Sequence, residues 1–251
     1  MNKPITLIAC FIFFLLSGTA FAQDELKIAE DKDSKKDTKV YVLRSLDGKK
    51  QTVHIMPDYA HLILRISCHK DTITIHDYWG VPSGIKIFNE TFMVIEYEIR
   101  GGSNFALGNT LILCVNNFKL CEAAHVLRYT STDGYEKRGS YKIKMALVGN
   151  NVKTYKLNIS VHDKVVFYSH PENNFNYNSQ TVLNFDVSRN VFYSIKEDMY
   201  GNFITYSQKG KKHKLNVEGN FPGIILGTET YYFINNRWYE LAKGKELSEF
   251  D

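Results

Sequence analysis

"TLILCVNNFKLCEAAH", residues 110–125, contains two β-favouring runs on either side of a polar pair, Asn116-Asn117. Asparagine tolerates the positive backbone φ that a type I′ turn requires, and such a turn joins two antiparallel strands. The stretch therefore predicts a β-hairpin with the asparagine pair at its tip. In this register one face belongs to the core and carries the large apolar side chains of Leu111, Leu113, Val115, Phe118 and Leu120.

The two cysteines of this hairpin, Cys114 and Cys121, share its other face. With the turn at the asparagine pair they sit diagonally, with Cα atoms roughly 7–8 Å apart, which exceeds the comfortable span of a disulfide. A four-residue loop over 116–119 would place them directly opposite each other and would let a disulfide close. His125 lies about 13 Å further along an extended strand, and zinc-finger spacing is not matched. We expect no metal site and no cofactor.

The same rhythm of short apolar runs and turn residues continues through the rest of the chain. Turn signals about 8–12 residues apart predict an all-β protein, an antiparallel meander of hairpins. We expect these hairpins to form a β-sandwich or two small packed β-sheets or subdomains. The expected turns are Asp47-Gly48, 69–71, 149–151, 162–163, 188–190, 209–210 and Asn235-Asn236.

The chain divides into three parts. Residues 1–22 have the order of a secretory signal peptide, with a basic residue, the apolar run "ITLIACFIFFLL" and a small-residue cleavage site that ends at Ala22. Residues 23–38 are charged and indicate a flexible lead-in. Residues 39–251 form the expected all-β domain, with a possible subdomain break at "RGGSNFALGN", residues 100–109. We therefore expect an exported protein, periplasmic or extracellular, with no transmembrane span.

The composition fits a large exported domain with an aromatic-rich core. Phe, Tyr and Trp make up 14% of the chain, and these bulky residues are favoured in strands. The formal net charge of +4 is modest, so we expect no nucleic-acid partner. The order of leader, charged lead-in and aromatic-rich strands resembles that of many exported bacterial proteins, and this resemblance implies no particular activity.

Glu96 and Glu98 project from one strand face, and paired carboxylates are the catalytic groups of glycoside hydrolases. Their spacing resembles the E-x-D-x-x-E strand of laminarinase-like jelly-roll glycosidases. The resemblance stops where the next carboxylate should follow, because Arg100 or Gly101 stands there. We interpret these glutamates as part of a solvated charged face and assign no catalytic residue. A secreted, glycosidase-like hydrolase whose site matches no motif is the alternative.

Two further stretches combine aromatic rings with polar turns. "HDYWGVP", residues 76–82, places two rings before a turn, and "HPENNFNYNSQ", residues 170–180, is an amide-rich loop. Flat rings stack on the apolar face of a sugar while amides bind its hydroxyl groups. The candidate binding residues are Tyr78, Trp79, Asn173, Asn174, Phe175, Asn176 and Tyr177.

These stretches predict an exported, non-catalytic recognition protein that binds a glycan or an envelope protein through loops at the ends of its sheets. A structural or inhibitor-type envelope protein differs from this reading only in the kind of partner. The rings and amides also have a purely structural interpretation, in which Trp79 anchors the core and the asparagines cap turns.

Overall fold

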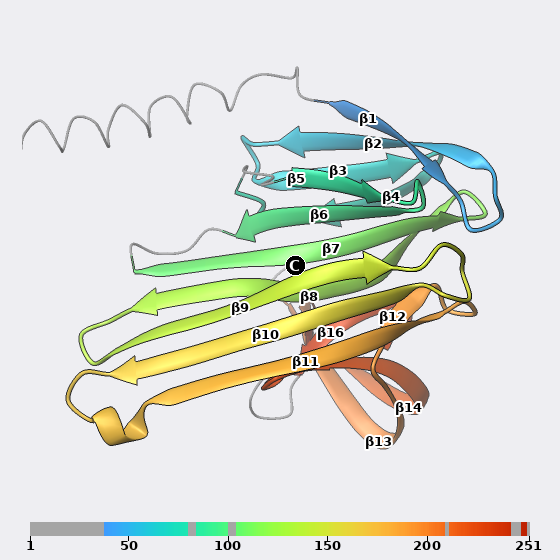
Figure 1. Ribbon diagram of the computed structural model, residues 1–251. Coiled ribbons are helices and arrows are strands. Elements are labelled where there is room, and N and C mark those ends of the chain that lie inside the picture. The colour runs from blue at the N-terminus through green and yellow to red at the C-terminus, as the bar shows by residue number, and fades with distance from the viewer. Residues whose placement is uncertain (1–37, 80–83, 100–103, 209–210, 242–246, 250–251) are drawn as a thin grey trace, which may run out of the picture.

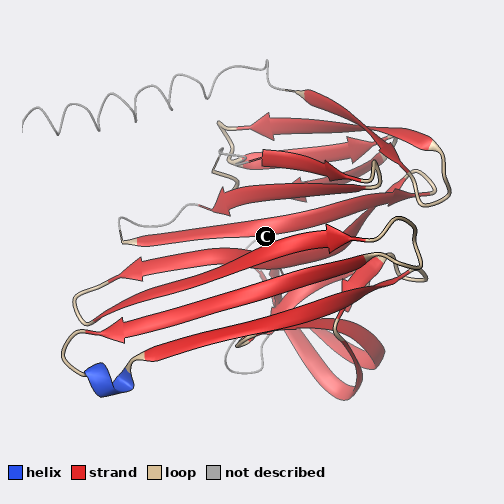
Figure 2. Cartoon of the chain, viewed as in Figure 1, coloured by secondary structure: helices blue, strands red, loops and turns tan. Residues whose placement is uncertain are grey.

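The computed structural model describes residues 38–79, 84–99, 104–208, 211–241 and 247–249. The proposed leader and most of the charged lead-in therefore lie outside the described residues. The prediction of an all-β antiparallel meander is confirmed, since the described chain forms three antiparallel sheets and one short 3₁₀ turn (Figures 1 and 2).

Each sheet is a meander in which a strand pairs with the next strand along the chain. The N-terminal sheet comprises β1 (Lys39–Arg44), β2 (Lys50–Asp58), β3 (Ile63–Cys68) and β4 (Asp71–Ile75). The central sheet comprises β5 (Gly84–Phe88), β6 (Phe92–Ile99), β7 (Phe105–Asn116), β8 (Lys119–Asp133), β9 (Lys137–Val148), β10 (Lys156–Phe167), β11 (Phe175–Asp186) and β12 (Val191–Tyr193). The C-terminal sheet comprises β13 (Ile195–Gln208), β14 (Lys211–Leu226), β15 (Glu229–Ile234), β16 (Arg237–Leu241) and β17 (Leu247–Glu249).

Most predicted turns coincide with the ends of these strands. Asn235 and Asn236 both adopt positive φ, 51° and 66°, between β15 and β16, as a two-residue hairpin turn requires. The turns at 47–48, 69–71, 149–151 and 188–190 are confirmed as well. The expected turn at 209–210 falls between β13 and β14, outside the described residues.

The prediction of a turn at 162–163 is wrong. These residues lie inside β10, which pairs continuously with β9 on one side and β11 on the other. Val161 is buried whereas His162 is exposed, so the alternation of a strand passes through His162-Asp163 without interruption. Polar residues were mistaken for a chain reversal because one face of this strand is open to solvent.

The central hairpin forms, but its tip lies one residue later than predicted. Asn117 and Phe118 adopt positive φ, 48° and 65°, and Cys114 pairs directly with Cys121. This register places Leu120 in the core opposite Val115. Its backbone N–H donates to the Asp71 carboxylate, with an N–O distance of 2.7 Å. Phe118, predicted in the core, lies instead at the tip, where its ring meets the His69 ring edge-on.

The central sheet buries both of its faces in the region of β6 to β8. We call the face toward the N-terminal sheet the outer face and the opposite one the inner face. The outer face of β6 to β8 packs against the apolar side chains of β1 to β4. This cluster joins Leu43, Val53, Ile55, Leu64, Ile66 and Ile75 of the N-terminal sheet to Met93, Ile95, Tyr97, Leu111, Leu113, Val115 and Leu120 of the central sheet.

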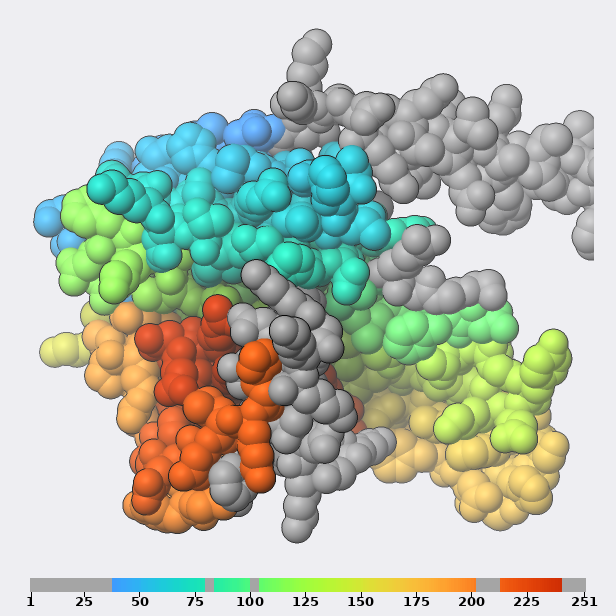
Figure 3. Space-filling view, turned by 180° about the vertical axis from the view of Figure 1, so that it is seen from behind, coloured from blue at the N-terminus to red at the C-terminus, as the bar shows by residue number. Residues whose placement is uncertain are grey.

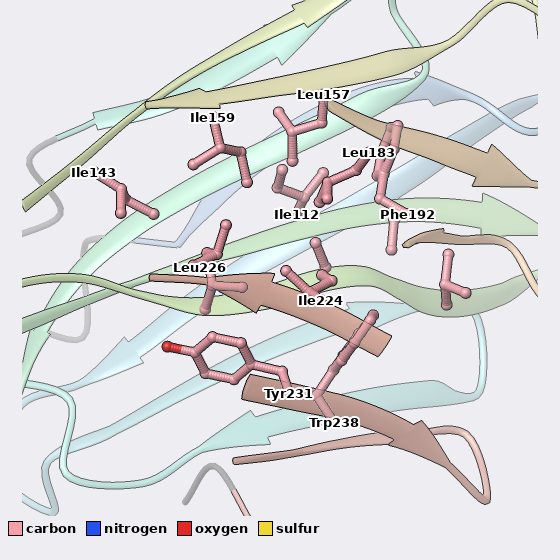
Figure 4. Close-up of a cluster of buried hydrophobic side chains, with 14 of the residues drawn as sticks. Ile112, Ile143, Leu157, Ile159, Leu183, Phe192, Ile224, Leu226, Tyr231 and Trp238 are labelled. Carbon is pink, nitrogen blue, oxygen red and sulfur yellow. The ribbon is translucent and has the colours of Figure 1, made fainter. Parts of the chain in front are cut away.

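The inner face packs against the C-terminal sheet and forms the largest apolar cluster found among the described residues, part of which is drawn in Figure 4. Strands β7 to β12 all contribute to it, and Ile224, Leu226, Tyr231 and Trp238 enter it from the C-terminal sheet. The Trp238 indole also donates a hydrogen bond of 2.8 Å to the backbone carbonyl of Glu122 on β8. Seen from behind, the C-terminal strands lie below the N-terminal sheet, with the long hairpins of the central sheet beside them (Figure 3).

The possible subdomain break at residues 100–109 overlaps the first residues of β7. Residues 100–103 lie outside the described chain, and β7 begins at Phe105. β7 pairs with β6 on one side and with β8 on the other. Both sides of the proposed break therefore contribute to the same sheet, and the division of residues 39–251 into subdomains stays a prediction.

Candidate functional site

The two rings of the first candidate stretch have different environments. Tyr78 is buried in the outer-face cluster, beside the rings of Tyr59 and Tyr97, and this burial raises the pKa of its hydroxyl. Trp79 is 43% exposed, and its backbone N–H donates to the carbonyl of Glu98 on β6. Tyr78 is therefore a packing residue, whereas Trp79 presents part of its surface to solvent.

The prediction of a loop over 170–180 is wrong in its second half. The stretch forms a 3₁₀ turn, Pro171–Asn173, and from Phe175 onward it belongs to β11. The carboxamide oxygen of Asn174 accepts a hydrogen bond from the backbone N–H of Phe167, so this side chain closes the β10–β11 connection. Phe175 and Tyr177 are about 40% exposed, and their rings are nearly parallel, with centroids 6.2 Å apart. Asn173 and Asn176 are exposed as well.

The two candidate stretches lie far apart in the sheet. Tyr78 and Trp79 contact the end of β6, whereas Phe175 and Tyr177 lie on β11, and four strands separate β6 from β11 in the sheet order (Figure 1). No interaction between the two stretches is found in the described residues. The stacked pair on β11 is therefore the stronger candidate for a contact with a ligand.

A hollow lined mostly by polar and charged residues, which sequence reasoning missed, lies on the outer face of β9, β10 and β11, with a volume of about 690 Å³. The N-terminal sheet does not cover this part of the face, and the C-terminal sheet lies behind it (Figure 1). Cross-strand pairing sets its side chains in rows. One row is Lys142, His162 and Asn178, and the next is Lys144, Ser160 and Gln180.

Within the first row, Nδ1 of His162 lies 2.5 Å from the carboxamide oxygen of Asn178. Because that oxygen can only accept, Nδ1 carries the proton in this arrangement. The bond fixes the imidazole ring beside the hollow. The strict alternation along β10 is the pattern of a strand with one open face. This face was not predicted because the strand was expected to end in a turn at 162–163.

On the inner face, a row of polar groups leads from the stacked rings toward a pair of carboxyl groups. Asp163 lies directly between Tyr177 and Tyr141 across the strands. The Tyr141 hydroxyl is buried without a hydrogen-bond partner in the described chain. Glu229 and Glu240 of the C-terminal sheet lie close enough to influence it. Burial, together with a hydrogen bond that protonated Glu240 donates to the Glu229 carboxylate, raises the pKa of Glu240 to about 7.

The two pairs of glutamates have different surroundings. Glu229 and Glu240 lie close enough for each to influence the ionisation of the other. Glu96 and Glu98 are each paired with a cation, Lys86 at 3.6 Å and Arg128 at 3.7 Å. Glu96 and Glu98 were expected on a solvated charged face, and the structure shows them only partly exposed and each beside a cation.

A hydrogen-bonded pair of polar side chains, Tyr97 and His125, is buried beneath the N-terminal sheet. The Tyr97 hydroxyl lies 2.6 Å from Nε2 of His125, and Nδ1 of that ring lies 3.5 Å from Glu122. Both Tyr97 and His125 are almost completely buried, so a substrate has no access to them. This arrangement satisfies polar atoms in the core rather than performing chemistry.

The described residues include three cysteines, and all three are free thiols. Cys114 and Cys121 face each other as free thiols, and Cys68 lies in the other cluster. No group of histidine, cysteine or carboxylate side chains suited to a metal ion occurs in the described part of the chain. Within that same part, no helix has the length and apolar character needed to cross a bilayer.

No family model matches this chain, and neither a curated protein nor a solved structure is similar to it. A function must therefore be inferred from the fold and the surfaces of the molecule itself.

Proposed function

We propose that this chain is an exported, non-catalytic recognition protein that binds a glycan or an envelope protein. The observation that carries the proposal is the stacked pair Phe175 and Tyr177. Two large rings stand about 40% exposed and nearly parallel on one strand. Exposed rings in this arrangement offer a flat apolar platform to the ring face of a sugar.

The surroundings of this pair support the proposal. Asn176 points to the opposite face of β11, beside Asn178, so the two rings alone form the platform. Tyr177 also packs over Gly227 of the C-terminal sheet, where an added Cβ would come within 3.3 Å of its ring. The platform is therefore held by a sheet contact and needs little ordering when a ligand binds, which favours affinity.

Two expectations about architecture and location belong to the same proposal. The apolar cluster between the N-terminal sheet and β6 to β8 supports a β-sandwich arrangement. Removal of a leader after Ala22 would deliver the chain to the periplasm or the medium. Sequencing the amino terminus of the secreted protein tests the second expectation, and a first residue other than Gln23 would count against it.

The test of recognition compares two variants on a glycan array. Phe175→Ala removes one ring of the platform, and Tyr135→Ala removes a fully exposed aromatic ring from a turn outside the platform. We expect the first change to weaken binding about tenfold, since one stacked ring contributes about 1–1.5 kcal/mol. The Tyr135→Ala control should bind as the unchanged protein does.

Other outcomes would replace this proposal. Equal loss in both variants would show that the platform is not the contact. Absence of binding to every glycan, followed by co-purification of an envelope protein from the host, would favour a structural or inhibitor-type role. Turnover of any glycan would revive the hydrolase alternative.

A further inference from the structure

The outer face of β9, β10 and β11 carries a concentration of positive charge. Lys142 and Lys144 lie on β9, and Lys156 and Lys164 lie on β10. All four are exposed. Their summed charge of +4 equals the formal net charge of the whole chain. The other charged residues together therefore carry no net charge.

These lysines have no acidic partner in the described residues. None of the four lies within 4 Å of a carboxylate in that part of the chain. The three strands contain two acidic residues, Asp163 and Asp186. Asp163 lies on the inner face, beside Tyr141. Asp186 is buried and is neutralised by Lys196 and Arg189. Arg138 lies on the same face of β9 as these lysines, but it is not counted with them because it lies opposite Asp133 of β8.

The spacing of the rows suits an extended chain of sugars. Neighbouring rows on one face lie about 6.8 Å apart along a strand, and neighbouring strands lie about 4.8 Å apart. Lys142 and Lys144 therefore stand one row apart. Ser160 and the carboxamides of Asn178 and Gln180 lie beside them in the same rows. The 690 Å³ hollow thus has two neighbouring cations along β9 and hydrogen-bonding side chains beside them on β10 and β11.

We propose that this hollow binds a linear acidic polysaccharide, one that carries a carboxylate or sulfate group on its repeating sugars. Ammonium groups pair with the acidic groups, and the amides and hydroxyls bind the sugar hydroxyls. The site is separate from the Phe175–Tyr177 platform, which lies on the inner side of β11, and does not depend on it. A single-stranded nucleic acid fits less well, because among the described residues on this face of β9 to β11 no Phe, Tyr or Trp offers a base a stacking surface.

The test measures binding of alginate, dextran sulfate, neutral dextran and a single-stranded oligonucleotide to the secreted chain. The double variant Lys142→Gln with Lys144→Gln removes two cations from the hollow. A matched double variant, Lys70→Gln with Lys153→Gln, removes two exposed lysines elsewhere. We expect the first double variant to bind an acidic polysaccharide about tenfold more weakly, and the matched one to change affinity less than about twofold. Circular dichroism confirms that both variants remain folded.

The salt dependence and the other probes sharpen the result. Affinity for the acidic polysaccharide should fall steeply between about 50 and about 200 mM salt, because ion pairs and counterion release drive binding. Equal weakening in both double variants would overturn the proposal, since it would reduce the effect to net charge. Tighter binding of the oligonucleotide, or no binding of either acidic polysaccharide, would overturn it as well.

The outcome can be separated from that of the proposed platform. Phe175→Ala should leave alginate and dextran sulfate binding unchanged while weakening the glycan that the platform recognises. Loss of the acidic ligand with the platform intact would remove this inference alone. Loss of array binding with the hollow intact would remove the platform alone.

Discussion

The outer face of the central sheet differs sharply between its two halves. Over β6 to β8 it carries apolar side chains and is covered by the N-terminal sheet. Over β9 to β11 it carries lysines, amides and hydroxyls and is open. On the inner face, both halves contribute to the apolar cluster that packs against the C-terminal sheet. One sheet can therefore serve as a packing layer in one half and as a binding surface in the other.

The local sequence records this difference. Leu111 to Val115 are all buried, so consecutive side chains on both faces of β7 are apolar or shielded. Strand β10 instead alternates buried and exposed positions from Lys156 to His162. A strand covered on both faces gives a continuous apolar run, whereas a strand with one solvated face gives alternation.

A charge placed on the covered half should have the largest effect. Leu113→Lys puts an ammonium group at a fully buried position, and we expect a loss of about 4 kcal/mol or more in the free energy of unfolding. Gln180→Leu makes an apolar change on the open half and should alter stability by less than about 0.5 kcal/mol. Urea denaturation of both variants measures the contrast. Similar losses in the two would mean that the halves do not differ in burial.

The carboxyl pair on the inner side gives a pH dependence of intermediate size. Glu240 has a folded pKa of about 7, above its ordinary value of 4.5. The folded chain therefore holds a proton that the unfolded chain has released between these pH values, and stability falls as pH rises through this window. Glu240→Gln should remove the fall and should be more stable than the unchanged protein by about 2–3 kcal/mol at pH above 7.

Thermal unfolding across pH 4 to 8 measures this difference. Glu96→Gln is the matched control, because Glu96 is ion-paired with Lys86 at a partly exposed position. It should leave the pH dependence unchanged. If the Glu240→Gln variant kept the same fall of stability with pH, another group would have to be its source.

The thiol pair at the tip of the covered hairpin should have the smallest effect. Directly opposed residues on antiparallel strands have Cα atoms about 4.5–5.5 Å apart, within the reach of a disulfide. Oxidised glutathione should therefore join Cys114 to Cys121, taking both thiol protons and two electrons as it becomes two reduced glutathione molecules. We expect a gain of about 1–2 kcal/mol.

Peptide mapping without reduction identifies the bridge. Cys68 lies in the outer-face cluster, away from the pair, and should stay free. The Cys121→Ser variant should form no internal bridge under the same treatment. A bridge that included Cys68 would contradict the register of this hairpin.

The general fold could be predicted from sequence because alternation and turn chemistry act locally. Asn235 and Asn236 illustrate this success, since asparagine adopts positive φ readily. The hairpin register could not be fixed in the same way. The choice between Phe118 and Leu120 as the partner of Val115 depends on Asp71 and the N-terminal sheet, which lie far away in the sequence.

The candidate surfaces were predictable to different degrees. Phe175 and Tyr177 were named from sequence because aromatic rings beside amides are typical of a sugar-binding surface. The lysine hollow was missed because its residues come from three strands, and their alignment follows from register rather than from any one segment. The burial of Tyr78 could not be known either, since it requires Tyr59 and Tyr97 as neighbours.

The hydrogen bond from the Trp238 indole to Glu122 joins positions 116 residues apart. During translation β8 leaves the ribosome well before β16 is synthesised. The apolar inner face of the nascent sheet is therefore exposed until β16 packs on it. The domain can therefore complete its fold only late in translation. A stalled or shortened polypeptide lacking Trp238 would expose this apolar face, which would bind chaperones or aggregate.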